Sequence, residues 1–351
     1  MSCNFMNFHD IFPTKWSFII FILYITLFVN QGWLVTASQD TDNKYNYNTT
    51  LAVLCTEVIK LTVCALIYSF CHSFCSLIVE TRNNIKVAAL YFVPASLYCI
   101  YNNLTYINLS TFDPTTYYMV LQLRVVATGV VFQLIFKKEL SAKQWISLIM
   151  LTFGCMIKQI NFGDVPVSDT QVAGVSEEPY MNKQLGVSFS LGSLLLVAQV
   201  LCSCLGGVYN EYLLKHHSSE VNLYLQNIFG YADSIICIFI LLVFQGNLQD
   251  IFSYNTVEQF FNYRVMLVVF NNAAIGIVTS FFLRYLNSIL KTFASALELV
   301  FTMVISRLLF SIPIYMNTII SVFVVIAATI TYSQNPVINV KTSKGEKSLG
   351  V

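Results

Sequence analysis

Long apolar stretches, separated by short polar linkers, run along the whole chain. A helix that crosses a lipid bilayer needs about 20 mostly apolar residues, and the chain offers ten stretches of roughly that length. The spans predicted from them, in round limits, are 16–37, 51–78, 85–108, 113–136, 143–161, 186–210, 221–245, 264–286, 289–310 and 314–333. The first ten residues carry no basic segment, and no small-residue cleavage site follows the first stretch, so we expect a true span there rather than a signal peptide.

Composition supports the same class of protein. Hydrophobic residues make up 56% of the chain and charged residues 11%, whereas soluble domains carry about 25% charged residues. The prediction is an all-α polytopic membrane protein of ten transmembrane helices. A net charge of +1 argues against a nucleic-acid partner. Most of the ten cysteines lie in apolar stretches and only four histidines occur, so we expect neither a metal site nor a cofactor.

The distribution of lysine and arginine predicts the orientation. With a cytosolic N-terminus, ten of these residues fall in cytosolic segments and four on the opposite side, as the positive-inside rule requires. Both termini are then cytosolic. The sequon Asn48-Thr49-Thr50 falls in the first loop on the other side of the membrane, which predicts N-glycosylation of Asn48.

The longest linker, 162–183, is acidic and divides the chain into two halves of five spans, 1–161 and 184–335, followed by a cytosolic tail, 336–351. A faint repeat joins the halves, because the segment 106–110 before the fourth span resembles the segment 285–289 before the ninth. An odd number of spans gives the two halves opposite orientations. We therefore predict inverted five-helix repeats, an architecture common among secondary transporters.

Ionised and amide side chains inside spans need partners, because a charge at mid-membrane costs about 2.5–3.5 kcal/mol. Glu57 and Lys60 are three residues apart in the second span and can pair on one helical face, as a structural pair or beside a substrate. Tyr98, Asn102 and Asn103 in the third span indicate either contacts between helices or a ligand-facing cavity.

Arg124 lies about midway along the fourth span, together with Tyr117 and Gln122, and no carboxylate lies within four residues of it. A guanidinium group binds phosphate through paired hydrogen bonds, which predicts a phosphate site. The alternative is an ion pair with a carboxylate from another span, where the candidates are Glu211, Asp233 and Glu298.

The second half offers a similar set of groups. Asn227 and Tyr231 lie four residues apart on one face of the seventh span, and Lys291 lies near the start of the ninth. A lysine at a helix N-terminus favours anions, although a cytosolic lysine that obeys the positive-inside rule explains Lys291 equally. Amides and aromatic rings can recognise a nucleotide base by hydrogen bonds and stacking, and cations can hold its phosphates. The combined set therefore predicts a nucleotide-like anion.

Several fragments resemble the nucleotide-sugar transporter family of the drug/metabolite transporter superfamily. They are Thr56-Glu57-Val58-Ile59-Lys60-Leu61, Tyr98-Cys99-Ile100-Tyr101-Asn102-Asn103, Leu121-Gln122-Leu123-Arg124, Gly207-Val208-Tyr209-Asn210-Glu211 and Asn287-Ser288-Ile289-Leu290-Lys291. The resemblance implies a non-enzymatic carrier in the Golgi or endoplasmic reticulum membrane. Such a carrier imports a nucleotide sugar and returns a nucleoside monophosphate.

The resemblance also implies roles for single residues. The implied substrate-binding residues are Tyr98, Asn102, Asn103, Tyr117, Gln122, Arg124, Asn227, Tyr231 and Lys291, and the implied structural or gating charges are Glu57, Lys60, Glu211, Asp233 and Glu298. Arg124 replaces a family lysine, Leu121 replaces a tyrosine, and Asp233 replaces the serine of sialic-acid nucleotide carriers. These differences argue against CMP-sialic acid.

The segments 112–117 and 122–126 resemble UDP-galactose carriers most, so UDP-galactose exchanged for UMP is the leading prediction. Another nucleotide sugar such as UDP-N-acetylglucosamine, a broad drug/metabolite exporter, a membrane glycosyltransferase using Asp40-Thr41-Asp42 and a purely structural subunit stay as alternatives. The chain contains no G-x-x-x-x-G-K-[ST] nucleotide-binding loop, so the expected driving force is exchange.

Overall fold

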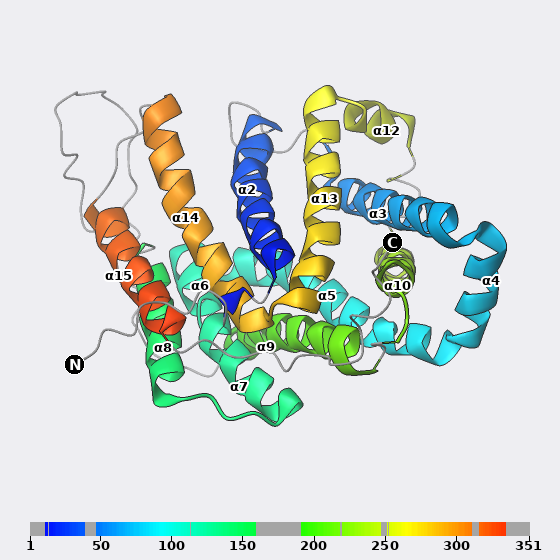
Figure 1. The fold of residues 1–351 in the computed structure, drawn as a ribbon. Coiled ribbons are helices and arrows are strands. Elements are labelled where there is room, and N and C mark those ends of the chain that lie inside the picture. The colour runs from blue at the N-terminus through cyan, green and yellow to red at the C-terminus, as the bar shows by residue number, and fades with distance from the viewer. Residues whose placement is uncertain are drawn as a thin grey trace.

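The fold is given by a computed structural model that describes residues 11–12, 14–38, 47–112, 114–158, 191–217, 220–246, 251, 253–310 and 316–334. Every long regular element in these ranges is a helix (Figure 1). The linker 162–183, the Asp40-Thr41-Asp42 segment and the tail 336–351 lie outside the described residues.

The helices follow the predicted spans closely. Those before residue 159 are α2 (Lys15–Ser38), α3 (Thr49–His72), α4 (Phe74–Asn83), α5 (Ile85–Thr111), α6 (Pro114–Leu121), α7 (Arg124–Phe136) and α8 (Ala142–Ile157). Those after residue 190 are α9 (Leu191–Tyr212), the π-helix η1 (Leu213–His217), α10 (Leu223–Gln245), α12 (Tyr254–Phe260), α13 (Tyr263–Tyr285), α14 (Ser288–Phe310) and α15 (Met316–Ser333).

Eight candidate membrane spans are long and apolar enough to cross a bilayer within the described ranges. They comprise α2, α3, most of α5, α6 together with α7, α9 with the start of η1, α10, α13 and α15. Helix α8 is apolar but shorter, and α14 has 23 residues but carries Lys291, Glu298 and Arg307. The chain is therefore a multi-pass membrane protein.

Two of the predicted spans are wrong in detail: one ends earlier than predicted, and the other is interrupted. The span predicted over 51–78 ends at His72, because Ser73 adopts φ 82° and ψ 145° and the chain turns into the separate helix α4. The span predicted over 113–136 is interrupted at Gln122 and Leu123. There the N–H groups of Gln122, Leu123 and Val125 each donate to the carbonyl three residues earlier, the tighter 3₁₀ pattern.

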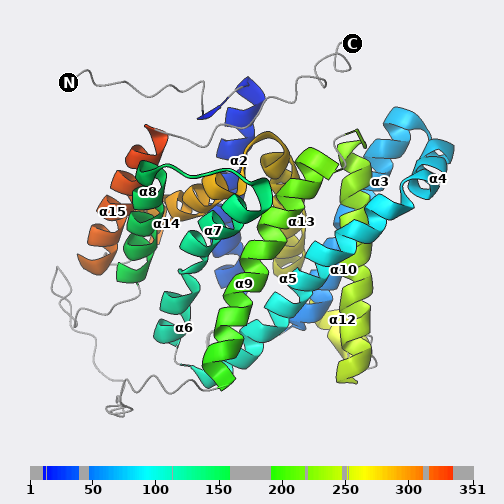
Figure 2. The ribbon, with the colours of Figure 1, turned by 90° about the horizontal axis from the view of Figure 1, so that it is seen from below.

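Helices from the two halves of the chain pack against each other throughout. Helix α5 packs on α9 and α10, α13 packs on α2 and α3, α7 packs on α9, and α14 packs on α2. Helix α8 lies along α15, α3 along α10, and α7 against α14 (Figures 1 and 2). The core therefore forms between the halves rather than inside each of them.

Small and polar residues allow this close packing. Gly154 of α8 lies against Val324 and Val325 of α15, and the Ser321 hydroxyl donates to the Gly154 carbonyl at 2.6 Å. Small interfacial residues of this kind bring membrane helices together. On the outside, large apolar side chains such as Leu134, Phe153 and Phe323 are 60–72% exposed, as expected of a surface that faces lipid.

Candidate functional site

Arg124 and Lys291, the two cations predicted to hold phosphate, lie near one another. Arg124 is the first residue of α7, Lys291 lies in the first turn of α14, and each is partly buried. Lys291 interacts electrostatically with both Arg124 and Glu211. Neither cation forms an ion pair within the described part of the chain, where the ion pairs are Lys60–Glu57 and Lys215–Glu211. Two like charges in a low dielectric repel strongly, so an anion between them would be stabilising.

Side chains from four further helices surround Arg124. The Tyr101 hydroxyl of α5 lies within hydrogen-bonding reach of Arg124, and Tyr24 of α2 and Cys155 of α8 interact with it electrostatically. The Cys204 thiol of α9 donates to the Arg124 carbonyl at 3.2 Å. Arg124 of α7 thus has neighbours on α2, α5, α8 and α9.

The charged groups of α8 and α14 extend this cluster. Glu298 interacts with both Arg124 and Lys158, so a carboxylate lies near the cations without forming an ion pair with Arg124 in the described structure. Tyr24 and Ser295 share a hydrogen bond of 3.3 Å between their hydroxyl groups. The cluster around Arg124 therefore contains charges and hydroxyl groups from both halves of the chain.

Tyr98 joins the same cluster from α5. Its ring packs against the Gly206-Gly207 pair of α9, where a Cβ added to Gly206 would lie 3.4 Å from Cζ of Tyr98. Tyr98 also interacts with Cys204 and Tyr101. The glycine pair thus lets α9 approach Tyr98 closely, and Tyr98 connects to Arg124 through Cys204 and Tyr101.

A second polar cluster lies between α3, α10 and α13. Lys60 pairs with Glu57 at 2.6 Å, as the sequence predicted, and its Nζ lies 4.5 Å from the centroid of the Tyr231 ring. The Tyr231 and Ser280 hydroxyl oxygens are 3.5 Å apart. Asn227 is buried in the same region, beside Cys64. Two of the predicted binding residues, Asn227 and Tyr231, therefore belong to the Lys60 cluster.

Tyr117 is part of a buried hydrogen-bond network. The Gln199 side chain of α9 donates to the hydroxyl oxygens of Tyr117 and Thr105, both at 2.8 Å, and accepts from Asn108 at 2.7 Å. Tyr117 and Gln199 are 1% and 0% exposed. The Tyr117 hydroxyl is thus already hydrogen-bonded within the protein. Tyr101 interacts with both Tyr117 and Arg124 and so connects this network to Arg124.

The remaining predicted residues lie in varied settings. Asn102 is exposed, while Asn103 donates to the Cys99 carbonyl at 2.9 Å and accepts from Gln245 of α10 at 3.1 Å. Gln122 lies at the interruption between α6 and α7, two residues before Arg124. Asp233 lies on α10 near Cys237. No contact in the described structure joins these four residues to Lys291.

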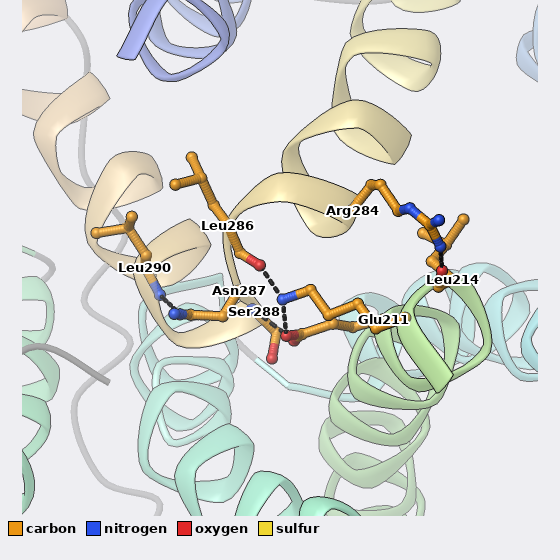
Figure 3. A network of polar contacts seen from close by, with 8 residues as sticks. Glu211, Leu214, Arg284, Leu286, Asn287, Ser288 and Leu290 are labelled. Carbon is orange, nitrogen blue, oxygen red and sulfur yellow. Dashed lines mark hydrogen bonds and ion pairs between the residues drawn. The ribbon is translucent and has the colours of Figure 1, made fainter. Parts of the chain in front are cut away.

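The carboxylate of Glu211, on α9, caps the first turn of α14, the helix N-terminus at which the sequence predicted a bound anion (Figure 3). Its Oε2 accepts from the Ser288 amide at 2.7 Å and its Oε1 accepts from Lys215 at 2.8 Å. Lys215 also donates to the Leu286 carbonyl, and Asn287 Oδ1 accepts from the Leu290 amide at 2.7 Å. Protein groups therefore cap two amides of this turn.

Asn48 caps α3, and its side-chain oxygen accepts from the Thr50 and Leu51 amides at 2.9 and 3.2 Å. The sequon thus spans the beginning of a helix, and its glycosylation stays a prediction. The described residues contain no group of three or more metal-binding side chains.

Sequence reasoning missed Tyr24, Tyr101 and Gln199. Tyr101 lies three residues from Tyr98 on a neighbouring position of the same helical face, a spacing that could have indicated it. Tyr24 and Gln199 have contact partners 82–271 residues away in the chain, among them Tyr117 and Ser295, and no local pattern marks them.

Comparisons with known proteins extend over nearly the whole chain. The profile of a family described as "Nucleotide-sugar transporter" matches residues 15–333. The "UDP-galactose transporter senju" of Drosophila melanogaster is 50% identical over 349 residues, which cover 95% of this chain and 90% of that protein. "CMP-sialic acid transporter 1" of Oryza sativa subsp. japonica is 27% identical, over 90% of this chain and 93% of that protein.

One crystal structure shares the fold at a TM-score of 0.61 and 11% sequence identity. The match covers 92% of this chain and 96% of that one. At such low identity the likeness extends to the arrangement of helices alone.

Proposed function

The chain belongs to the nucleotide-sugar transporter family, and from that premise we propose that it exchanges UDP-galactose for UMP across the Golgi membrane by alternating access. Members of the family are transporters rather than enzymes. The choice of UDP-galactose is supported by the 50% identical relative that carries this substrate in its name. It is also supported by Arg124 and Asp233, where this sequence departs from the sialic-acid nucleotide pattern.

The observation that carries the proposal is the Arg124–Lys291 pair. The two cations come from different halves of the chain, interact with each other and have no ion-pair partner among the described residues. A pyrophosphate between them would neutralise both, and guanidinium and ammonium groups are the usual phosphate ligands in proteins. Tyr98 and Tyr101 then lie beside the phosphate site, where they can hold the ribose or the base.

We propose that residues 1–161 and 184–335 form inverted repeats, and the helix packing supports this. In such a repeat α2 corresponds to α9, α3 to α10, α5 to α13 and α7 to α14. The packing of α5 on α9 then corresponds to that of α13 on α2, and the packing of α5 on α10 to that of α13 on α3. The packing of α7 on α9 corresponds to that of α14 on α2, and all six packings occur. Three further packings join a helix to its own counterpart in the other half: α3 with α10, α7 with α14, and α8 with α15. A pseudo-two-fold of this kind lets a central site open alternately to either side.

Exchange follows from the same charges. In an empty site Arg124 and Lys291 repel each other across the interface between the halves, which resists the movement that brings the halves together. A bound nucleotide sugar or UMP removes that repulsion, so either one permits the transition. In this scheme both termini are cytosolic, and the cation pair binds substrate from the cytosol and releases it to the lumen.

Counterflow in proteoliposomes tests the proposal. Purified protein is reconstituted into vesicles preloaded with UMP, CMP or GMP, and uptake of radiolabelled UDP-galactose, UDP-N-acetylglucosamine and CMP-sialic acid is measured. We expect UMP preloading to stimulate UDP-galactose uptake most. Stimulation by CMP or GMP without stimulation by UMP would overturn the UDP-sugar assignment, and uptake that is independent of any preloaded nucleotide would overturn exchange.

A further inference from the structure

One end of the proposed repeat joins helices that are distant in the chain through packing and polar contacts. At this end, α9 and η1 lie against α13 and the beginning of α14. The predicted topology turns this end, formed by η1 and the α13–α14 junction, to the cytosol.

Polar contacts bind this end together (Figure 3). Glu211 is 0% exposed and joins the end of α9 to the Ser288 amide of α14. Lys215 of η1 joins Glu211 to the Leu286 carbonyl, and Arg284 of α13 donates to the Leu214 carbonyl of η1. Three of these contacts cross between segments about 70 residues apart in the chain.

Glu211 also acts on the transport site. The Ser288 amide that it binds lies three residues before Lys291, so the carboxylate fixes the turn that carries this lysine. Glu211 interacts electrostatically with Lys291 as well. A carboxylate that binds a helix N-terminal amide and faces a lysine makes the same two kinds of contact as a phosphate group would.

We propose that Glu211 is a positioning residue that closes the cytosolic end of the transport path and holds Lys291 opposite Arg124. Its carboxylate serves as an internal anion for the first turn of α14 while that end is closed. Opening the end separates Glu211 from Ser288 and from Lys291, which leaves both free for a substrate phosphate. The proposal rests on the proposed function, because it takes the Arg124–Lys291 pair as the substrate site.

A native thiol reports on this end of the molecule. Cys204 lies seven residues before Glu211 on α9, which places it two turns deeper on the same helical face. It is 2% exposed and contacts Arg124. A reagent that arrives from the cytosolic side therefore reaches Cys204 only after the Glu211 contacts open.

The test measures labelling of Cys204 by a membrane-impermeant maleimide added outside sealed microsomes, whose outer face is cytosolic. A C202S background leaves one thiol in the peptide that mass spectrometry follows. We expect E211Q and K215M to raise the labelling rate about tenfold, which corresponds to about 1.4 kcal/mol, a typical worth of a hydrogen bond to a charged group. K215R keeps the charge and should label at close to the unmodified rate.

E139Q is the matched control, because it removes the charge of an exposed carboxylate between α7 and α8. Wild-type labelling in both E211Q and K215M, or an equal rise in E139Q, would overturn the proposal. The assay contains no substrate, so it stands apart from the counterflow experiment. If labelling behaves as expected while UMP exchange fails, the closure by Glu211 holds and the substrate assignment falls.

A second readout separates positioning from simple structural support. If Glu211 holds Lys291 in place, K215M should raise the half-saturating UMP concentration in counterflow, and K215R should restore it. A fall in maximal rate with unchanged half-saturation in K215M would show that the network does not position Lys291.

Discussion

The Lys60 cluster and the Arg124–Lys291 pair both contain cations inside the helical bundle, but within the described residues only the first includes an ion pair. In the Lys60 cluster a carboxylate lies 2.6 Å from the ammonium group on the same helix, and an aromatic ring lies 4.5 Å from it. The Arg124–Lys291 pair joins two positive charges from different halves, with no ion-pair partner in the described structure. The first cluster pairs its cation within one helix, whereas in the proposed function the charges of the second are neutralised by the substrate phosphates.

This difference decides which charges to test first for transport. A neutralised pair within one helix keeps its contacts whichever way the halves move. A repulsive pair between the halves changes its energy when the halves move and when an anion binds. A coupling between binding and movement requires such a difference between states.

The largest effect is expected for R124A. Loss of the guanidinium group removes charge-assisted hydrogen bonds worth about 1.5–3 kcal/mol each, so we expect UDP-galactose counterflow to fall about 100-fold or more. Thermal unfolding in detergent should change less than transport, because Arg124 forms no ion pair in the described structure and the side-chain hydrogen bond lost is the one to Tyr101. R82A, on the exposed surface of α4, is the control and should transport normally. Counterflow at the wild-type rate in R124A would remove Arg124 from the site.

K291M should have the next largest effect. We expect counterflow to fall about tenfold, less than in R124A, because an ammonium group offers phosphate a point charge rather than a bidentate fork. If both cations contact one ligand, as proposed, the R124A/K291M double variant should lose less than the product of the single losses. Strictly multiplicative losses would indicate that the two cations act on separate steps or separate groups.

G276A probes the Lys60 cluster through its packing. A Cβ at residue 276 would overlap Cδ of Lys60, so the lysine must move and its ion pair must loosen. Overpacking of this kind destabilises by about 1–3 kcal/mol, which a lower unfolding temperature should show. G32A is the matched control, since a Cβ there meets nothing within 4 Å. Equal unfolding temperatures for the two variants would mean that α3 and α13 are packed less tightly than described.

N103A should have the smallest effect on stability. Its hydrogen bonds go to a carbonyl of its own helix and to the exposed Gln245, so we expect a change below about 0.5 kcal/mol. Counterflow then reports on its assignment as a binding residue. A fall of more than about tenfold with unchanged unfolding temperature would place Asn103 at the substrate, and unchanged counterflow would limit it to the contact with α10.

Hydropathy predicted where helices lie, because the length of an apolar run is a property of the local sequence. It did not predict the turn at Ser73 or the interruption at Gln122 and Leu123, each of which depends on one or two residues within an apolar run. The Glu57–Lys60 pair was predictable for the same local reason, as three residues separate its members.

The candidate site was predictable only in part. Charged residues inside spans are conspicuous, so Arg124 and Lys291 could be singled out from the sequence. Tyr24 and Gln199 could not, because tyrosine and glutamine become informative only once α2 or α9 is placed beside its neighbours. The contact between Glu211 and Ser288, 77 residues apart, likewise depends on how α9 meets α14.

The interruption at Gln122 and Leu123 also has a mechanical consequence. A helical rod bends most easily where its regular backbone bonds give way to a tighter turn, and here that point directly precedes Arg124. A change of angle at this joint would reorient α7 relative to α6. Because Arg124 is the first residue after the joint, such a change would turn its side chain with only a small displacement of its backbone.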